Sequence, residues 1–264
     1  MERRTVGKVQ IVALIDAVES YPGSAVYPQA GDALQQFARH MDAEGKLPLN
    51  FASFVLFDGD AVVLVDTGWG PEHGGKLVEE LKAAKISATD IGTVIFTHLH
   101  GDHTGWNLDR ATGQPLFPNA RYLVPKADWD HYRQQNPPPS SFVRDMLPLD
   151  KMGRMELIEG ERSLSPSLVA IPTPGHTPGH TSVVITSDGE HGLVLGDVVI
   201  SPIDAEQPDW PNSFEWDTGI ARTTRLKMIE RLIESQAMVA ASHLPVPGFG
   251  RFVKSGTGSA WSPA

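Results

Sequence analysis

The residues most able to do chemistry are four potential metal ligands in one short stretch: His98, His100, Asp102 and His103. They directly follow the apolar run 94–96, which is typical of a buried strand. If that strand continues, His98 and His100 point to the same side, and Gly101 then lets the backbone bend. Such a cluster could address two cations, with a pair of imidazoles for one and a carboxylate with an imidazole for the other. These ligands suit zinc and its first-row neighbours.

Three further residues of ligand type occur much later in the chain. His176 lies in the glycine-rich turn 173–181, Asp197 ends the segment 193–197, and His243 follows the apolar stretch 237–241. Each is placed where a strand gives way to a loop, and sites commonly assemble there. Cysteine is absent, so a metal site must be built from nitrogen and oxygen ligands alone.

The composition is that of an ordinary globular protein, with 41% hydrophobic and 20% charged residues over 264 positions. The formal charge of −10 argues against nucleic acid as a partner, because phosphate binding needs a cationic face. No apolar run approaches the roughly 20 residues needed to cross a bilayer. Asp16 interrupts the apolar run 9–15, which favours a first strand over a secretory signal. We therefore expect a cytoplasmic protein with a small-molecule substrate and no membrane partner.

Strands and helices must alternate to position these residues. Periodicity and turn signals predict strands at 9–15, 51–57, 61–65, 93–97, 121–124, 155–158, 168–171, 182–186, 192–195 and 237–241. They predict helices at 33–41, 76–84, 129–135 and 226–233, and a loop over 202–212. This mixture indicates an α/β sandwich in one domain spanning 1–264. Residues 19–49 form an insertion that could act as a lid or a dimer contact.

The motifs HLHGDH (98–103), TPGHTPGH (173–180), LGD (195–197) and a late SH (242–243) together resemble the metallo-β-lactamase superfamily. The resemblance runs from 62 to 243 in the order of that family. It implies an α/β fold of the α+β kind: a four-layer αβ/βα sandwich of two mixed β-sheets flanked by helices, with metals at one edge.

Carried over position by position, the resemblance assigns His98, His100 and His176 to one metal. It assigns Asp102, His103 and His243 to the other, with Asp197 bridging the two. A hydroxide held between the cations would be the nucleophile, and the catalytic role of Asp102 would be to orient it or to carry a proton to the leaving group. The implied cofactors are two divalent metal ions, with zinc favoured; manganese, cobalt or iron would also suit these ligands.

Other residues near the motifs are expected to support the site. The resemblance makes His180 a structural neighbour of the ligands, and Asp66 should hold the histidine loop by hydrogen bonds without touching metal. Trp69, Trp106 and Phe249 stand beside the metal loops and are candidates for lining a substrate pocket. The remaining histidines are expected to be surface or core residues: His40, His73, His131 and His191.

Within the superfamily, the tail of the chain is most similar to methyl parathion hydrolase and related lactonases and esterases. The similarity rests on 208–210, 221–225, 243–251 and Trp261. Acyl-homoserine lactonases often carry a tyrosine three residues after the bridging aspartate, and Ile200 stands there instead. The branch with a flavin-linked diiron site has a glutamate at the position of His100.

The resulting expectation is a dinuclear metal-dependent hydrolase that uses a bridging hydroxide to cleave a small, mostly apolar ester, lactone or phosphotriester. One alternative is an enzyme resembling mononuclear iron persulfide dioxygenases. Another is a catalytically silent member of the fold that binds a small molecule. The sequence leaves open the exact substrate, the native metal, β-lactam hydrolysis and whether the chain forms a homodimer.

Overall fold

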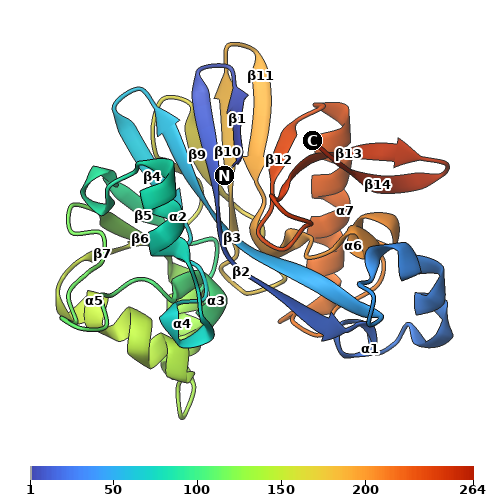
Figure 1. Ribbon diagram of the computed structural model, residues 1–264, viewed down its shortest axis with the longest axis horizontal. Coiled ribbons are helices and arrows are strands. Elements are labelled where there is room, and N and C mark those ends of the chain that lie inside the picture. Colours follow the sequence, from blue (N-terminus) through green and yellow to red (C-terminus); the bar gives the residue numbers. More distant parts are fainter. Residues whose placement is uncertain (1) are drawn as a thin grey trace.

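The computed structural model describes residues 2–264 and contains two mixed β-sheets of seven strands each (Figure 1). The first sheet follows the chain order β1 to β7: Glu2–Val6, Val9–Pro22, Lys46–Asp58, Ala61–Val65, Thr93–Ile95, Arg121–Pro125 and Met155–Ile158. Strands β1 to β4 pair antiparallel, and β4 to β7 pair parallel.

The second sheet has the order β14 to β8, so each strand again lies beside its neighbours in sequence. Its strands β8 to β14 are Arg162–Ser163, Leu168–Pro172, Thr181–Ser187, Glu190–Val194, Met238–Ala240, Phe249–Ser255 and Gly258–Pro263. All pairs are antiparallel except β11 with β12. The carboxyl ends of β11 and β12 therefore lie side by side.

The sheets face one another, and helices cover the outer face of each (Figure 1). The alternation of side chains along β2 shows how a strand contributes to both of these layers. Ile11 and Ala13 enter the core between the sheets, whereas Val12 and Leu14 enter the core beneath the outer helices. Because successive side chains of a strand point to opposite faces, a strand buried on both faces reads as one continuous apolar run.

The first sheet carries the helices α2 (Leu77–Ala84), α4 (Lys126–Gln134) and α5 (Leu147–Lys151), and the second carries α7 (Thr218–Glu234). Shorter helical segments are α1 (Gly23–Val26), α3 (Gly101–Thr104), α6 (Pro202–Glu206), η1 (Gly31–His40), η2 (Pro71–His73), η3 (Ala88–Asp90), η4 (Phe142–Met146) and η5 (Gly196–Val198). The expected four-layer sandwich of two mixed sheets flanked by helices is confirmed. Among residues 2–264, no helix combines the length and apolar character needed to span a bilayer.

Several expected elements differ in extent or type. The expected loop 202–212 begins with α6, because Ser201 and Asp204 form a capping box. Helix α7 begins eight residues before the predicted 226, where Asp217 accepts a hydrogen bond from the Ile220 amide. The predicted helix 33–41 is a 3₁₀ segment, η1, and the hairpin β13–β14 was not predicted.

A β-bulge in β2 sets the entrance to the insertion 19–49. The register with β3 shifts between Ile15 and Ala17, which leaves Asp16 without a cross-strand partner. The carboxylate of Asp16 instead accepts hydrogen bonds from the amides of Trp69, Gly70 and Leu77 at 2.6, 3.2 and 2.7 Å. One buried acid thus joins the bulge to the loop that follows β4 and to the start of α2.

Candidate metal centre

The seven expected ligands come from both sheets and meet at one edge of the sandwich. The first sheet supplies His98 and His100, which follow β5, and Asp102 and His103, which lie in α3. The second sheet supplies three residues that each follow a strand: His176 after β9, Asp197 after β11 and His243 after β12. The side-by-side ends of β11 and β12 explain why Asp197 and His243 are neighbours despite their separation in sequence.

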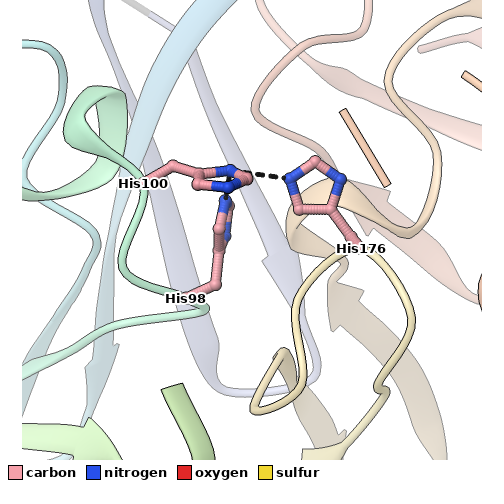
Figure 2. Close-up of side chains that lie close together, drawn as sticks. All are labelled: His98, His100 and His176. Atoms are coloured by element: carbon pink, nitrogen blue, oxygen red, sulfur yellow. Dashed lines mark hydrogen bonds between the residues drawn. The ribbon is translucent and has the colours of Figure 1, made fainter. Parts of the chain in front are cut away.

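Three histidines form a first group of converging nitrogen atoms, shown in Figure 2. Nδ1 of His100 lies 3.0 Å from Nε2 of His98 and 3.0 Å from Nε2 of His176. His98 and His176 are buried, and His100 is half-buried at the edge of the pocket. This is the set His98, His100 and His176 that the resemblance assigned to one metal.

Asp102, His103, Asp197 and His243 form a second group. Nε2 of His243 lies 3.4 Å from Oδ2 of Asp102 and 3.0 Å from Oδ2 of Asp197. Nε2 of His103 lies 3.3 and 3.5 Å from the same two oxygens. The group therefore offers two imidazoles and two carboxylates around one small volume.

Asp197 belongs to both groups by distance. Its Oδ2 also lies 3.3 Å from Nε2 of His176 and 3.8 Å from Nε2 of His98. Its other oxygen, Oδ1, is buried without a hydrogen-bond partner in the described residues. A carboxylate with this placement can face two cations at once.

Hydrogen bonds behind the ligands fix which ring nitrogen carries a proton. Nδ1 of His103 donates to Oδ2 of Asp66 at 2.9 Å, and Nδ1 of His243 donates to the carbonyl of Asn50 at 2.7 Å. The hydroxyl of Thr97 donates to Asp66, so it accepts from Nδ1 of His98 at 3.1 Å. A neutral imidazole has only one N–H. In the neutral form of these three histidines, the inward Nε2 atom is therefore the one with the lone pair.

This arrangement fits divalent cations on chemical grounds. In the neutral rings, inward nitrogen lone pairs and carboxylate oxygens converge at 3.0–3.8 Å, and Nε2 of His103 and Oδ1 of Asp197 have no hydrogen-bond partner among residues 2–264. Buried acceptors that face only other acceptors are costly unless a cation or proton lies between them. The donor set is all nitrogen and oxygen, which suits zinc and its neighbours.

The charge states agree with this interpretation. Burial lowers the pKa of His98 and His176 well below the ordinary value, so both imidazoles are neutral as ligands must be. Burial alone would raise the pKa of Asp197, but the nearby His243 and His103 outweigh it and hold that pKa well below its usual range. Burial likewise opposes ionisation of His243, but the carboxylates of Asp197 and Asp102 raise its pKa to about 10. A cation would displace that proton.

One acid and one histidine brace the ligand loops. Asp66, whose backbone has the unusual φ of 61°, accepts from the amide and hydroxyl of Thr97 at 2.7 Å each and from His103. His180 lies behind Asp197: its Nε2 accepts from the Asp197 amide at 2.9 Å, and its Nδ1 donates to the Thr173 carbonyl. These are the non-ligand positions expected for Asp66 and His180.

Sequence reasoning missed Asp128, a buried acid that joins the two ligand loops. It accepts from the Leu99 amide at 3.1 Å in one loop, and from the Thr177 hydroxyl at 2.9 Å and the Gly179 amide at 2.5 Å in the other. Desolvation by burial raises its pKa to about 6. No motif pointed to Asp128, because its partners are mostly backbone groups that become neighbours only in the fold.

A pocket of about 470 Å³ opens over the ligands. His100, Asp102, His176, Asp197 and His243 form part of its floor, and the wall residues are Tyr21, Leu49, Phe51, Trp69, Ile200, Ser213 and Phe214. A wider groove of about 760 Å³ beside β1 and β13 contains none of the ligand groups.

Of the three aromatic residues expected in the pocket, only Trp69 lines it. Its ring stacks between Phe51 and His73, with centroid separations of 4.3 and 4.4 Å. The expectation for Trp106 is wrong because its indole N–H turns away to Asp16 at 2.9 Å. The expectation for Phe249 is wrong because β13 directs its ring into the core between the sheets, against Phe54.

The histidines not expected as ligands stay outside the two ligand groups. His40 pairs with Glu206 at 2.7 Å, and His131 contacts Gln135 at 3.1 Å. His191 is exposed in β11. His73 is the nearest to the pocket, through its stacking on Trp69.

Comparison with known proteins places these features in context. The family model described as "Metallo-beta-lactamase superfamily" matches residues 49–236, more than half of the chain. An N-acyl homoserine lactonase of Bacillus cereus is 26% identical over 170 residues, which are 64% of this chain and 62% of that protein. A probable metallo-hydrolase of Bacillus subtilis (strain 168), YflN, is 27% identical over 216 residues, covering 70% of this chain and 76% of that protein.

Two solved structures share the fold over nearly the whole chain. The hydrolase AbOPH, described as in the beta-lactamase superfamily, has a TM-score of 0.88 and 25% identity, covering 99% of this chain and 96% of that chain. AidC, a dizinc quorum-quenching lactonase solved with a product, has a TM-score of 0.86 and 24% identity, covering 100% and 97%. Among the curated relatives, the chain spans about three fifths of the length of several, 62%, 60% and 64%. The family match, the four-layer fold and the two histidine–aspartate groups agree: the chain belongs to the metallo-β-lactamase superfamily.

Proposed function

We propose that the chain is a dinuclear metal-dependent hydrolase that cleaves a small, mostly apolar ester, lactone or phosphotriester. The observation that carries the proposal is the placement of Asp197. Its Oδ2 lies 3.3 Å from His176 in one ligand group and 3.0 Å from His243 in the other. A shared carboxylate of this kind is what two cations about 3.5–4 Å apart require. The similarity to lactonases and to the hydrolase AbOPH supports the same class of reaction.

The ligands of the proposed cations are His98, His100 and His176 for one, Asp102, His103 and His243 for the other, and Asp197 for both. When bound, two divalent cations would lower the pKa of a shared water to about 7 and polarise the bond to be cleaved. Asp102 faces the pocket with 22% of its side chain exposed. Its carboxylate can orient a water by accepting a hydrogen bond, and can take a proton from it.

The pocket walls favour an uncharged, apolar substrate. Five of the seven wall residues are apolar or aromatic, Leu49, Phe51, Trp69, Ile200 and Phe214, and no lysine or arginine lines the pocket. A substrate that carries a carboxylate, such as a β-lactam, would find no cationic side chain there to pair with. Esters, lactones and phosphotriesters have no such requirement.

We further propose that residues 2–264 act as one domain and that the insertion 19–49 is a fixed wall of the pocket. Hydrogen bonds tie it to the segment 204–216 at several points. Ser213 donates its amide to the Val26 carbonyl at 2.9 Å and its hydroxyl to the Ala25 carbonyl at 2.6 Å. The hydroxyl of Tyr27 donates to Asp204 at 2.7 Å. The buried bond of Tyr27, together with the two bonds of Ser213, argues against a mobile lid.

The test is elemental analysis combined with a substrate panel on the same metal-loaded sample. We expect about two divalent ions per chain and hydrolysis of an aryl ester, an N-acyl homoserine lactone or a dialkyl aryl phosphate. One iron per chain with oxygen uptake on a persulfide would favour the dioxygenase instead. Two ions per chain without hydrolysis of any panel member, β-lactams included, would favour a silent binding protein.

A further inference from the structure

Tyr21 stands on the pocket wall because of the bulge in β2. Beyond the register shift at Asp16, Tyr21 pairs with Leu47, and Glu19 pairs with Leu49. Cross-strand partners project to the same face of a sheet, as do residues two apart in a strand. Tyr21 therefore shares a face with Leu49. Both side chains line the pocket above Asp102 and His243.

The hydroxyl of Tyr21 is not used by the protein. Within residues 2–264 it has no hydrogen-bond partner, whereas Ser213, which brings the other hydroxyl of the pocket lining, donates to the Ala25 carbonyl. Burial, with the negative charge of Asp102 adding to it, raises the pKa of Tyr21. The phenol therefore keeps its proton at neutral pH, and this pocket-lining residue carries a hydrogen-bond donor that the described residues do not use.

The Tyr21 hydroxyl can donate to an oxygen that gains negative charge in the proposed reaction, the leaving oxygen of the substrate. The ligand carboxylates and imidazole lone pairs of the floor are acceptors, and the other wall side chains are mostly apolar. In the tetrahedral intermediate, the leaving oxygen and the oxygen from water, which the ligand groups would hold at the floor, occupy different corners of the acyl carbon. The leaving oxygen thus turns toward the walls as it gains negative charge.

We propose that Tyr21 donates a hydrogen bond to the leaving-group oxygen of the substrate; this inference rests on the proposed hydrolase function. In the reaction, the oxygen of water forms a bond to the acyl carbon and the bond from that carbon to the leaving oxygen breaks. The leaving oxygen keeps the bonding electron pair and takes one proton of the water. The second proton goes to solvent, and the products are a carboxylate and an alcohol. Tyr21 stabilises the charge on the leaving oxygen and keeps its own proton.

The test is Tyr21→Phe, which removes the hydroxyl and keeps the ring. Both forms are assayed on esters of one acyl group with alcohols of rising pKa, from nitrophenol to an alkyl alcohol. A hydrogen bond to the leaving oxygen matters more as the leaving group becomes poorer. We expect kcat/KM to fall about 10-fold for nitrophenyl esters and about 100-fold for alkyl esters, with metal content and thermal midpoint unchanged.

Tyr132→Phe is the matched control. Its ring lies 6.2 Å from that of His100, yet Tyr132 is not part of the pocket lining, so rates should stay within about twofold on every ester. Equal losses for all leaving groups in Tyr21→Phe, or no loss, would overturn the role of Tyr21. If the wild-type protein hydrolyses no ester or lactone, it is the proposed function that fails.

Discussion

The floor of the pocket and its walls are built in different ways. The floor consists of ligands whose chemistry restricts them to histidine and aspartate, and every one of them follows a strand or lies in the short helix after one. The walls come from the insertion 19–49, from β3, from the loop after β4 and from the segment 200–214, and they use mostly ordinary apolar residues. Chemistry therefore marks the floor in the sequence, whereas most of the wall residues are recognised only in the folded chain. The following substitutions probe that difference, beginning with the largest expected effect.

Asp197→Asn should damage the floor most. An amide keeps the shape of the side chain and loses the negative charge that faces histidines of both groups. We expect metal content to fall from about two ions to one or fewer, and kcat/KM to fall at least about 10³-fold. Elemental analysis and kinetics on the same preparation measure this. His131→Ala, a histidine outside both groups, should change neither quantity, and an active, fully loaded Asp197→Asn would contradict the proposed centre.

Arg225→Met should damage the walls without touching the floor. The Arg225 side chain is 1% exposed, pairs with Glu215 at 2.7 Å, and donates to the carbonyls of Pro208 and Trp210. Removing it leaves Glu215 buried without its partner, which costs about 3–5 kcal/mol of unfolding free energy. Urea unfolding measures the loss.

Arg222→Met is the control on the same helix. Its ion pair with Asp209 is half-exposed, so the expected loss is under about 1 kcal/mol. Similar losses for the two variants would show that the buried arginine does not hold the wall segment.

Asp128 joins the two ligand loops, and it should make the free energy of unfolding depend on pH. Its pKa is about 6 in the folded protein because of burial, against an ordinary value of about 3.9 when unfolded. Between these values the folded state binds more protons, so stability falls as pH rises from about 4 to about 6, by about 3 kcal/mol from this group. Asp128→Asn should remove that slope. Parallel stability curves for wild type and variant across this range would refute the assignment.

Trp69→Ala should have the smallest effect of the set, confined to substrate binding. The ring lines the pocket and stacks on Phe51. We expect KM to rise about 10-fold, or about 1.4 kcal/mol, with two metals retained. Trp106→Phe, which removes a hydrogen bond to Asp16 and part of a ring outside the pocket, should leave KM unchanged. A rise in KM for Trp106→Phe alone would show that Trp106, and not Trp69, contacts the substrate.

The four-layer fold could be predicted from the sequence. So could all seven residues that the structure brings together: His98, His100 and His176 in one group, and Asp102, His103, Asp197 and His243 in the other. Their types are rare in apolar surroundings, so they stand out in a pattern. The predicted place of Phe249 in the pocket was wrong, because closeness to His243 in the chain does not determine the face to which a strand directs a ring. Tyr21 and Asp128 were missed since a tyrosine and a single aspartate carry no signal until the bulge in β2 and the loops after β5 and β9 bring them to the site.

The origin of the ligands in two different sheets has a mechanical consequence. Four of them belong to the first half of the chain and three to the second. Each bound ion would therefore link the two halves. Binding of such an ion raises the free energy of unfolding in proportion to the logarithm of the free ion concentration. Removal of the ions by a chelator would then weaken the contact between the two halves at this edge first. The thermal midpoint would depend on the available metal as well as on the sequence.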